Sequence, residues 1–215
     1  MNTDILTVLD FIGIISFTIS GSLVAARKDM DYLGVCILGI VTAVGGGAIR
    51  DITIGSVPPR MFRDPSYVLV AFVAANLVFL FLYFHLSGKS KPKMNHIFGK
   101  TLFWFDTIGL ASFTVNGVIV GQTMTNGGLF LCTFLGVITG VGGGVLRDLL
   151  ANEVPAIFVR HVYAVASIAG ALLTCLLWST NHYAAMSAGL VSVILIRFLA
   201  KKFEWNLPHI HKDKG

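Results

Sequence analysis

Two copies of one short pattern place glycines and charged residues inside long apolar stretches of the chain. The first copy contains Gly45, Gly46, Gly47, Arg50 and Asp51, and the second contains Gly142, Gly143, Gly144, Arg147 and Asp148. A charge at the depth of the hydrocarbon core costs about 3 kcal/mol or more, so such residues are candidates for an ion pathway. A structural ion pair that holds helices together is the alternative interpretation, and the sequence leaves both open.

The glycine triplets also allow two interpretations. A kinked helix would expose carbonyl oxygens to a water-filled path, where K⁺ or Na⁺ would bind transiently. Close helix packing is the other, because small residues recur at four-residue spacing, as in Gly39, Ala43 and Gly47. We predict that both helices are bent or broken at the triplets, and that the protein has no other metal site.

Asp10 and Asp106 are two further carboxylates within apolar segments. At a rise of about 1.5 Å per residue, Asp10 lies near the depth of Arg50, and Asp106 lies near the depth of Arg147 on the other side of the membrane centre. An unpaired guanidinium would repel cations and leave its donors unsatisfied. We therefore predict the pairs Arg50 with Asp10 and Arg147 with Asp106, with the aspartate next to each arginine as a competing partner.

Hydroxyl and amide side chains recur at matching places in the two segments that carry these aspartates. They are Ser16, Thr18, Ser20, Thr114 and Asn116. Their oxygens suit a permeating cation, but a hydrogen bond across helices is the simpler explanation for any single one.

The composition places these residues in a membrane protein. The 215 residues are 55% hydrophobic and only 13% charged, and the mean hydropathy is +0.79. Soluble domains carry about 25% charged residues, so soluble, disordered and nucleic-acid-binding proteins are excluded. The sequence has no nucleophile elbow, HExxH or phosphate-binding loop, and it therefore predicts neither an enzyme nor a bound cofactor.

Stretches of about 20 apolar residues predict an all-α integral membrane protein with seven transmembrane helices, surrounded by membrane lipids. The predicted spans are residues 5–26, 33–55, 66–86, 101–121, 129–150, 160–179 and 183–200. The last span ends in Arg197, Lys201 and Lys202, whose long side chains are expected to reach the headgroups. Thirteen Lys and Arg residues fall on the side of the C-terminus and three on the other. The positive-inside rule then predicts a cytoplasmic C-terminus and an external N-terminus.

The chain contains an internal repeat. The segment from Asp10 to Gly21 returns 96 residues later, from Asp106 to Gly117, and the glycine triplets return 97 residues later. Each unit holds three spans, an odd number, so the second unit must be inverted in the membrane, as in many transporters. The predicted organisation is a first repeat over 1–86, a basic cytoplasmic loop over 87–100, an inverted repeat over 101–179, a seventh helix over 180–200 and a basic tail over 201–215.

The doubled Gly-Gly-Gly-x-x-Arg-Asp motif, together with the Asp-x-x-Gly and Ser-Phe-Thr segments that precede it, resembles the prokaryotic trimeric intracellular cation (TRIC) channels. Databases also label this domain as a glycine transporter. The resemblance covers residues 5–200. It implies a homotrimer, expected in a bacterial inner membrane, in which each protomer passes monovalent cations, mainly K⁺ but also Na⁺. The pore is expected between spans one, two, four and five.

Two other functions remain open at this point. A secondary transporter for glycine or another small amino acid would use the same inverted repeat, and Arg50 or Arg147 would bind the carboxylate. A purely structural scaffold explains the repeat but not the buried charges.

Overall fold

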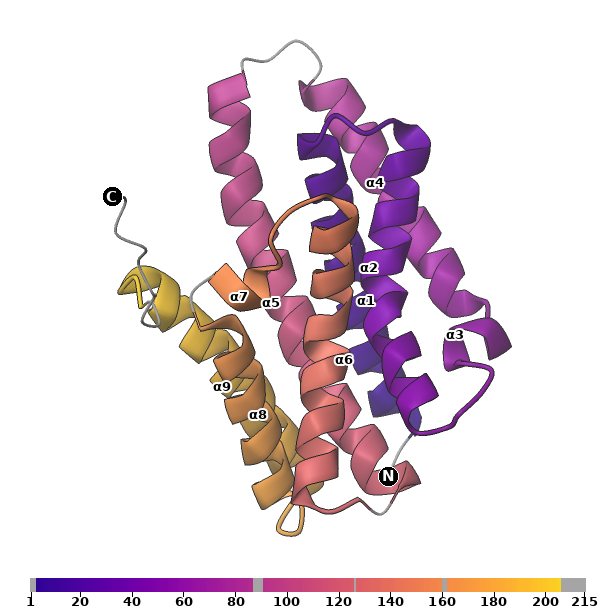
Figure 1. Cartoon of the computed structure of the whole chain (residues 1–215), viewed down its shortest axis with the longest axis vertical. Coiled ribbons are helices and arrows are strands. Elements are labelled where there is room, and N and C mark those ends of the chain that lie inside the picture. The colour runs from indigo at the N-terminus through magenta and orange to yellow at the C-terminus, as the bar shows by residue number, and fades with distance from the viewer. Residues whose placement is uncertain (1–2, 87–90, 126, 160–161, 206–215) are drawn as a thin grey trace, which may run out of the picture.

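The computed structural model describes residues 3–86, 91–125, 127–159 and 162–205, and these residues are helical apart from short connections (Figure 1). The helices are α1 (Thr3–Arg27), α2 (Tyr32–Thr53), α3 (Arg60–Arg63), α4 (Ser66–Leu86), α5 (Lys91–Met124), α6 (Leu129–Leu150), α7 (Ala156–Val159), α8 (Tyr163–Leu177) and α9 (His182–Lys202). Within the described ranges six helices are long and apolar enough to cross a membrane: α1, α2, α4, α5, α6 and α9. The all-α membrane fold is therefore confirmed.

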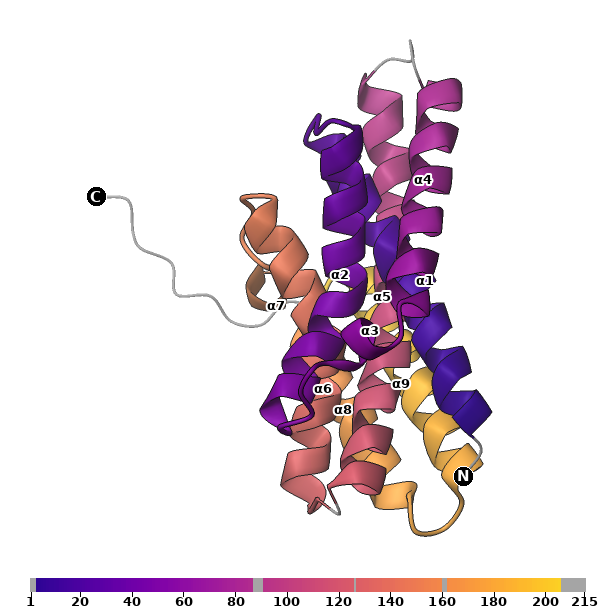
Figure 2. The same ribbon diagram turned by 90° about the vertical axis from the view of Figure 1, so that its right-hand side faces the viewer.

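α8 corresponds to the span predicted at 160–179, but it is shorter than the other six. Its 15 residues rise about 22 Å, whereas the hydrocarbon core is about 30 Å thick. The four-residue helices α3 and α7 lie in the connections that follow α2 and α6 (Figure 2). Such short helices are not predicted from the sequence, because four residues show no periodicity.

The prediction of a basic loop over residues 87–100 is wrong for most of this range. α5 begins at Lys91, so residues 91–100 are helical, and residues 87–90 lie outside the described ranges. Pro92 is tolerated in the first turn of a helix, and the polar residues after it do not prevent helix formation. α9, the predicted seventh span, ends slightly later than predicted, at Lys202, and residues 206–215 of the predicted basic tail lie outside the described ranges.

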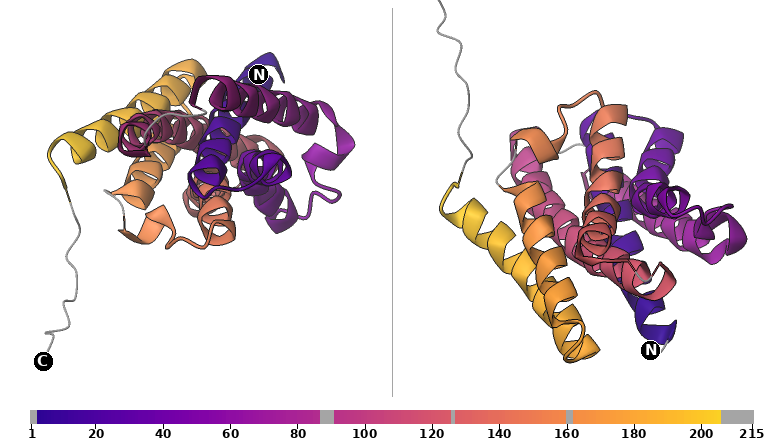
Figure 3. Two further views of the ribbon diagram at one scale, coloured as in Figure 1. Left: turned by 90° about the horizontal axis from the view of Figure 1, so that it is seen from above. Right: turned by 60° about the horizontal axis from the view of Figure 1, so that its bottom comes forward.

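Four helices form the centre of the molecule, since α1 and α2 of the first repeat pack against α5 and α6 of the second. α4 packs on α1 and α2, and α8 packs on α5 and α6 in the corresponding place. α9 lies outside the repeat against α5 and α8, on the flank opposite α3 (Figure 3). α1 and α5 run in opposite directions (Figure 1), so the second repeat is inverted relative to the first.

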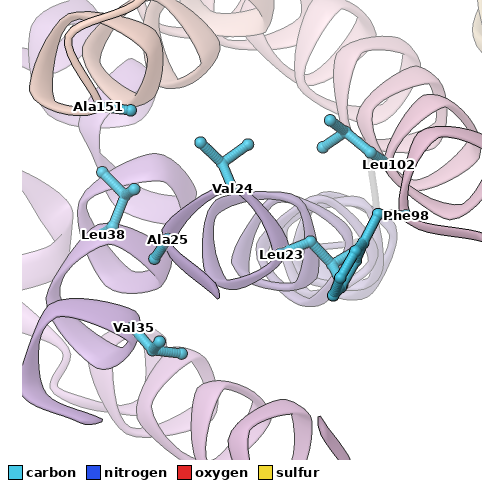
Figure 4. Close-up of a cluster of buried hydrophobic side chains, with 8 residues drawn as sticks. All are labelled: Leu23, Val24, Ala25, Val35, Leu38, Phe98, Leu102 and Ala151. Atoms are coloured by element: carbon cyan, nitrogen blue, oxygen red, sulfur yellow. The ribbon is translucent and has the colours of Figure 1, made fainter. Parts of the chain in front are cut away.

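A cluster of buried apolar side chains joins the two repeats near the α1–α2 connection (Figure 4). Its members are Leu23, Val24, Ala25, Val35, Leu38, Phe98, Leu102 and Ala151. They converge from α1, α2, α5 and the end of α6. Since lipid is as apolar as these side chains, close packing rather than the hydrophobic effect holds the four helices together here.

Candidate functional site

The glycine triplets lie where α2 and α6 cross. Both helices run unbroken through their triplet. A Cβ atom on Gly46 would collide with the backbone carbonyl of Thr139, and one on Gly143 would collide with that of Thr42. The break predicted as one alternative at the triplets is absent, because the missing side chains are used to bring two backbones into contact. A bend there stays a prediction. Cation binding at these carbonyls stays a prediction.

An aromatic pair lies close to this crossing. Phe17 of α1 and Phe113 of α5 meet edge to face, with ring centroids 5.3 Å apart, and both are buried. The rings occupy equivalent positions in the two repeats, and Phe17 also fills the space beside Gly143. The local two-fold axis therefore passes between them. Their sequence signal is the repeated Ser-Phe-Thr segment, of which only the polar members are singled out above.

Buried charged side chains form two groups, one on each side of the Phe17–Phe113 pair along α1 and α5. We call them the Asp10 level and the Asp106 level. The Asp10 level comprises Asp10, Arg50, Asp51, Arg60, Tyr67 and Asn116, and the Asp106 level comprises Ser20, Asp106, Arg147, Asp148, Tyr163 and Arg197. All charged members except Arg60 are at most 5% exposed.

At the Asp106 level, Arg147 pairs with Asp106, as predicted from their depths. Arg147 Nη1 lies 2.7 Å from Asp106 Oδ1, and Arg147 Nε donates to Asp148 Oδ1 at 2.8 Å. The same Nη1 donates to the hydroxyl of Ser20 on α1. Tyr163 donates to Asp106 Oδ1 at 3.4 Å. The guanidinium of Arg147 thus binds two carboxylates of the second repeat and a hydroxyl of the first.

At the Asp10 level, the predicted pair of Arg50 with Asp10 is wrong, and Arg50 binds the competing partner, Asp51. Arg50 donates from Nε and Nη2 to Asp51 Oδ1 at 2.9 and 2.7 Å, and from Nη1 to Asn116 Oδ1 at 2.6 Å. Asn116 Nδ2 in turn donates to Asp10 Oδ1 at 2.9 Å. The amide lies between the two charges because Asn116 is longer than Ser20, which occupies the equivalent place in the other repeat.

Asp10 is paired instead with Arg60, which begins α3. Arg60 Nη1 lies 3.2 Å from Asp10 Oδ2, and the hydroxyl of Tyr67 donates to the same oxygen at 3.1 Å. The Arg60 side chain is 41% exposed, and its guanidinium lies 5.2 Å from the centre of the Tyr67 ring. The sequence places Arg60 in a connection, and nothing local indicates that it turns back toward α1.

Asp51 and Asp148 each hold the start of a short helix. Asp51 Oδ2 accepts from the backbone N–H of Arg60, and Asp148 Oδ2 accepts from that of Ala156, both at 2.8 Å. These N–H groups begin α3 and α7, and helix-starting N–H groups need an acceptor outside the helix. The geometry therefore favours the structural interpretation for these two aspartates, which fasten each loop to the helix before it.

Arg197 of α9 is a further site residue that the sequence analysis missed, as it missed Arg60, Tyr67 and Tyr163. It is 4% exposed, its Nη2 donates to Asp106 Oδ2 at 2.9 Å, and its Nε donates to Thr107 Oγ1 at 3.3 Å. Its guanidinium lies 4.5 Å from the centre of the Tyr163 ring and 5.0 Å from that of Phe103. The headgroup position expected for Arg197 is wrong, because α9 packs against α5 and brings the side chain to a buried carboxylate. Its position near the end of an apolar span resembles that of an ordinary anchoring residue, so no local signal distinguishes it.

Three of the five hydroxyl and amide candidates lie away from the arginines of both levels. Thr114 shares a hydrogen bond of 2.7 Å with Ser167 of α8. Thr18 is fully buried, and its hydroxyl has no hydrogen-bond partner in the part of the chain that the structure describes. Ser16 is 5% exposed. The remaining two candidates belong to the charged levels, since Ser20 accepts from Arg147 and Asn116 accepts from Arg50.

Each level borders a cavity. The cavity at the Asp10 level has about 30 Å³, which is room for about two water molecules. The cavity at the Asp106 level has about 340 Å³, and Arg27, Arg197 and Lys201 line it together with Asp106. The Phe17–Phe113 pair separates the two levels along α1 and α5.

Glu153 links the two repeats outside the membrane-spanning segments. It lies in the connection after α6 and forms ion pairs with Arg27 at 2.7 Å and with Lys28 at 3.1 Å, at the end of α1. Partial burial raises the pKa of Glu153, but the hydrogen bonds and charges of Lys28 and Arg27 outweigh burial and hold this pKa below its ordinary value. The carboxylate is therefore charged at neutral pH.

The fold and these levels define a membrane protein built from two inverted repeats around a polar centre. A family model described as Glycine transporter matches residues 7–83 and 103–179, which lie in the two repeats. A UPF0126 membrane protein of Deinococcus radiodurans is 40% identical and covers 93% of this chain and 89% of its own length. The UPF0126 inner membrane protein YadS of Escherichia coli is 36% identical, and the match covers 96% of this chain and 97% of that protein. A solved TRIC trimeric intracellular cation channel orthologue from Rhodobacter sphaeroides is 34% identical, with a TM-score of 0.81 over 93% of this chain and 98% of that one.

The chain therefore belongs to the family that comprises these membrane proteins and the prokaryotic TRIC channels. The resemblance recognised in the sequence is confirmed. The relatives are channels and membrane proteins rather than enzymes, in agreement with the prediction that this protein is not an enzyme.

Proposed function

We propose that this protein is a K⁺-permeable channel for monovalent cations, with one pathway inside each protomer of a homotrimer. The observation that carries the proposal is the pair of charge-balanced levels between α1, α2, α5 and α6. At each level two carboxylates are paired with two arginines, so the buried guanidiniums do not repel cations as unpaired ones would. The name of the Rhodobacter relative, a trimeric intracellular cation channel, supports the passage of cations and the trimer.

The proposed pathway runs from the Asp10 level past the Phe17–Phe113 pair to the Asp106 level. A buried edge-to-face ring pair leaves no room for a hydrated cation, so the rings must separate for ions to flow. We further infer that the N-terminus is external and the C-terminus cytoplasmic in a bacterial inner membrane, which puts the Asp106 level nearer the cytoplasm. The uneven distribution of Lys and Arg and the name of the Escherichia relative support this orientation and membrane.

Single-channel recording of the purified protein in planar bilayers tests the proposal. In a KCl gradient the wild-type protein should give unitary currents that reverse near the K⁺ equilibrium potential. Asp10→Asn and Asp106→Asn should each lower the conductance or shift the reversal potential toward that of Cl⁻, because each removes a carboxylate and leaves an arginine in excess. Asp29→Asn is the matched control: this carboxylate is exposed, and asparagine tolerates its positive φ.

Unchanged K⁺ over Cl⁻ selectivity in both folded aspartate variants would contradict the assignment of these carboxylates to the pathway. The detergent-corrected mass of the purified protein tests the trimer separately, and a monomer or dimer mass would overturn it.

A carrier for glycine is the second candidate function, because the matching family model bears that description and inverted repeats also serve carriers. Radiolabelled glycine uptake into liposomes from the same preparation distinguishes the two. Saturable uptake without unitary currents would favour the carrier, and currents without uptake would favour the channel.

A further inference from the structure

The two repeats differ in how they supply the second arginine to their buried aspartate. In the first repeat this arginine is Arg60, whose backbone N–H binds Asp51 while its side chain pairs with Asp10. The equivalent position in the second repeat, 96 residues later, is Ala156. Its backbone N–H binds Asp148 at the same distance of 2.8 Å, but it has no charge to offer Asp106. The second repeat therefore lacks an arginine that the first one has.

Arg197 supplies the missing charge from outside the repeat. It pairs with Asp106 Oδ2 at 2.9 Å and lies over the ring of Tyr163, as Arg60 pairs with Asp10 Oδ2 and lies over the ring of Tyr67. The pairing and the ring contact are thus the same at both levels, although the arginine comes from α3 in one and from α9 in the other. Arg197 differs in being buried, so its pair is shielded from solvent.

We propose that Arg197 is the counter-charge of Asp106 that sets the cation selectivity of this half of the pathway, and that α9 is part of the permeation machinery for this reason. The proposal rests on the channel function proposed above. With Arg197 the Asp106 level holds two carboxylates and two arginines. Without it two carboxylates face one arginine at this level. Arg27 and Lys201 also line the cavity, so the change is the loss of one positive charge, which increases the attraction for cations.

The cavity at this level allows the arginine to be relocated. Ala156 lines the cavity of about 340 Å³ together with Asp106, Arg147 and Arg197, so a longer side chain at position 156 has space toward Asp106. An arginine at position 156 would stand where Arg60 stands in the first repeat. The comparison of the two repeats thus suggests Ala156→Arg as a substitution that can replace the charge lost in Arg197→Gln.

The test compares Arg197→Gln with the double variant Ala156→Arg/Arg197→Gln in planar bilayers. Arg197→Gln should raise the K⁺ over Cl⁻ permeability ratio and the K⁺ conductance at low ionic strength, because an uncompensated charge in a low-dielectric cleft concentrates counter-ions by about tenfold or more. The increase should shrink at high salt, where charges are screened. The double variant should return both values to those of the wild type. Lys202→Gln is the matched control, since it removes an exposed basic charge from the same helix without contacting Asp106, and it should change neither value.

Unchanged selectivity in folded Arg197→Gln would overturn the proposal. If Arg197→Gln does not fold, the double variant decides: recovery of folding and selectivity supports the proposal, whereas recovery of folding with altered selectivity overturns it. Failure of both variants to fold would show that Arg197 is an anchor of α9 with no substitute at position 156, which also overturns the proposal.

Absence of cation currents in the wild-type protein would instead refute the proposed function, and the pairing is then tested by thermal unfolding. A double-mutant cycle of Arg197→Gln with Asp106→Asn should show strong coupling, and an arginine at position 156 should reduce that coupling. Additive effects in the cycle would overturn the role of Arg197 without reference to ion flow.

Discussion

Alanine substitutions at two adjacent glycines of α2, Gly46 and Gly47, should change stability in opposite directions. A Cβ atom on Gly46 would collide with the carbonyl oxygen of Thr139 and lie 3.2 Å from the nitrogen of Gly143, both on α6. A Cβ atom on Gly47 would meet only the end of the Arg50 side chain, at 3.8 Å. The two variants make the same chemical change in the same helix, and they differ only in the face that receives it.

The magnitudes follow from the contacts. A carbon and a carbonyl oxygen need about 3.3 Å, so Gly46→Ala must separate α2 from α6 by about 1 Å. Overpacking costs about 1–3 kcal/mol, and the upper value applies because the Cβ atom meets backbone atoms, which cannot rotate away. Replacing glycine by alanine in a helix stabilises the helix by about 1 kcal/mol, which offsets part of this cost. Gly46→Ala should therefore destabilise by about 2 kcal/mol, and Gly47→Ala should stabilise by up to about 1 kcal/mol. The difference of about 3 kcal/mol corresponds to about 6–12 °C in Tm on the scale of domains of this size.

Thermal unfolding of the detergent-solubilised variants, followed by fluorescence-detected size exclusion, measures the difference. Gly143→Ala should repeat the loss, because its Cβ atom would collide with the carbonyl of Thr42. Equal Tm values for Gly46→Ala and Gly47→Ala, in proteins that elute alike, would refute the close crossing. A larger loss at Gly47 than at Gly46 would indicate that the triplet serves an open face of the helix rather than its contact with α6.

Three further predictions concern single side chains. Phe17→Ala and Phe113→Ala should each raise the unitary conductance in planar bilayers, because each removes half of the ring pair between the two levels. Acidification should destabilise the protein through Glu153: its pKa is lowered in the folded state, so its ion pairs contribute fully above about pH 4.3 and are lost as the pH falls through the folded value. This contribution is less than about 1 kcal/mol for a partly exposed pair, and Glu153→Gln should remove it from the pH dependence of Tm. Thr18→Val should stabilise by about 1 kcal/mol because it removes a buried hydroxyl without a partner among the described residues, whereas Thr114→Val should destabilise by breaking the bond to α8.

Each of these has a clear contrary outcome. Unchanged conductance in folded phenylalanine variants would place the rings off the pathway. A pH dependence of Tm that is the same in Glu153→Gln as in the wild type would exclude the link between the α1–α2 and α6–α7 connections. Equal losses of Tm in Thr18→Val and Thr114→Val would show that the Thr18 hydroxyl has a partner in the membrane.

The sequence predicts the spans well because their boundaries depend on local composition. α6 is predicted at 129–150 and found at Leu129–Leu150, and α4 agrees equally well with its prediction. The repeat adds the inversion, since an odd number of spans in each unit leaves no other arrangement. Depth along a helix is also a local quantity, and it is sufficient to predict the pair of Arg147 with Asp106.

The rest depends on quantities that a depth argument does not contain. Depth places Arg50 near Asp10, but the rotation of α5 about its axis decides that the Asn116 amide lies between them. The contact of Arg197 with Asp106 depends on α9 packing against α5, a contact between residues 91 positions apart. The sequence near these residues predicts neither the position of the Asn116 amide nor the contact of Arg197 with Asp106. Both follow from how the helices pack against one another.

The comparison of the two levels indicates which property the protein maintains. The arginines that follow the glycine triplets, Arg50 and Arg147, each bind the next aspartate, but their Nη1 groups bind different partners, an amide in one repeat and a carboxylate in the other. The second arginine comes from α3 at one level and from α9 at the other. Each level nevertheless holds two carboxylates and two arginines, and Asp10 and Asp106 each also accept from a tyrosine at the start of α4 or α8. The common requirement is therefore the balance of charge at each depth rather than the identity of the donor, as expected where an unpaired charge costs several kcal/mol and a fixed excess of positive charge would exclude cations.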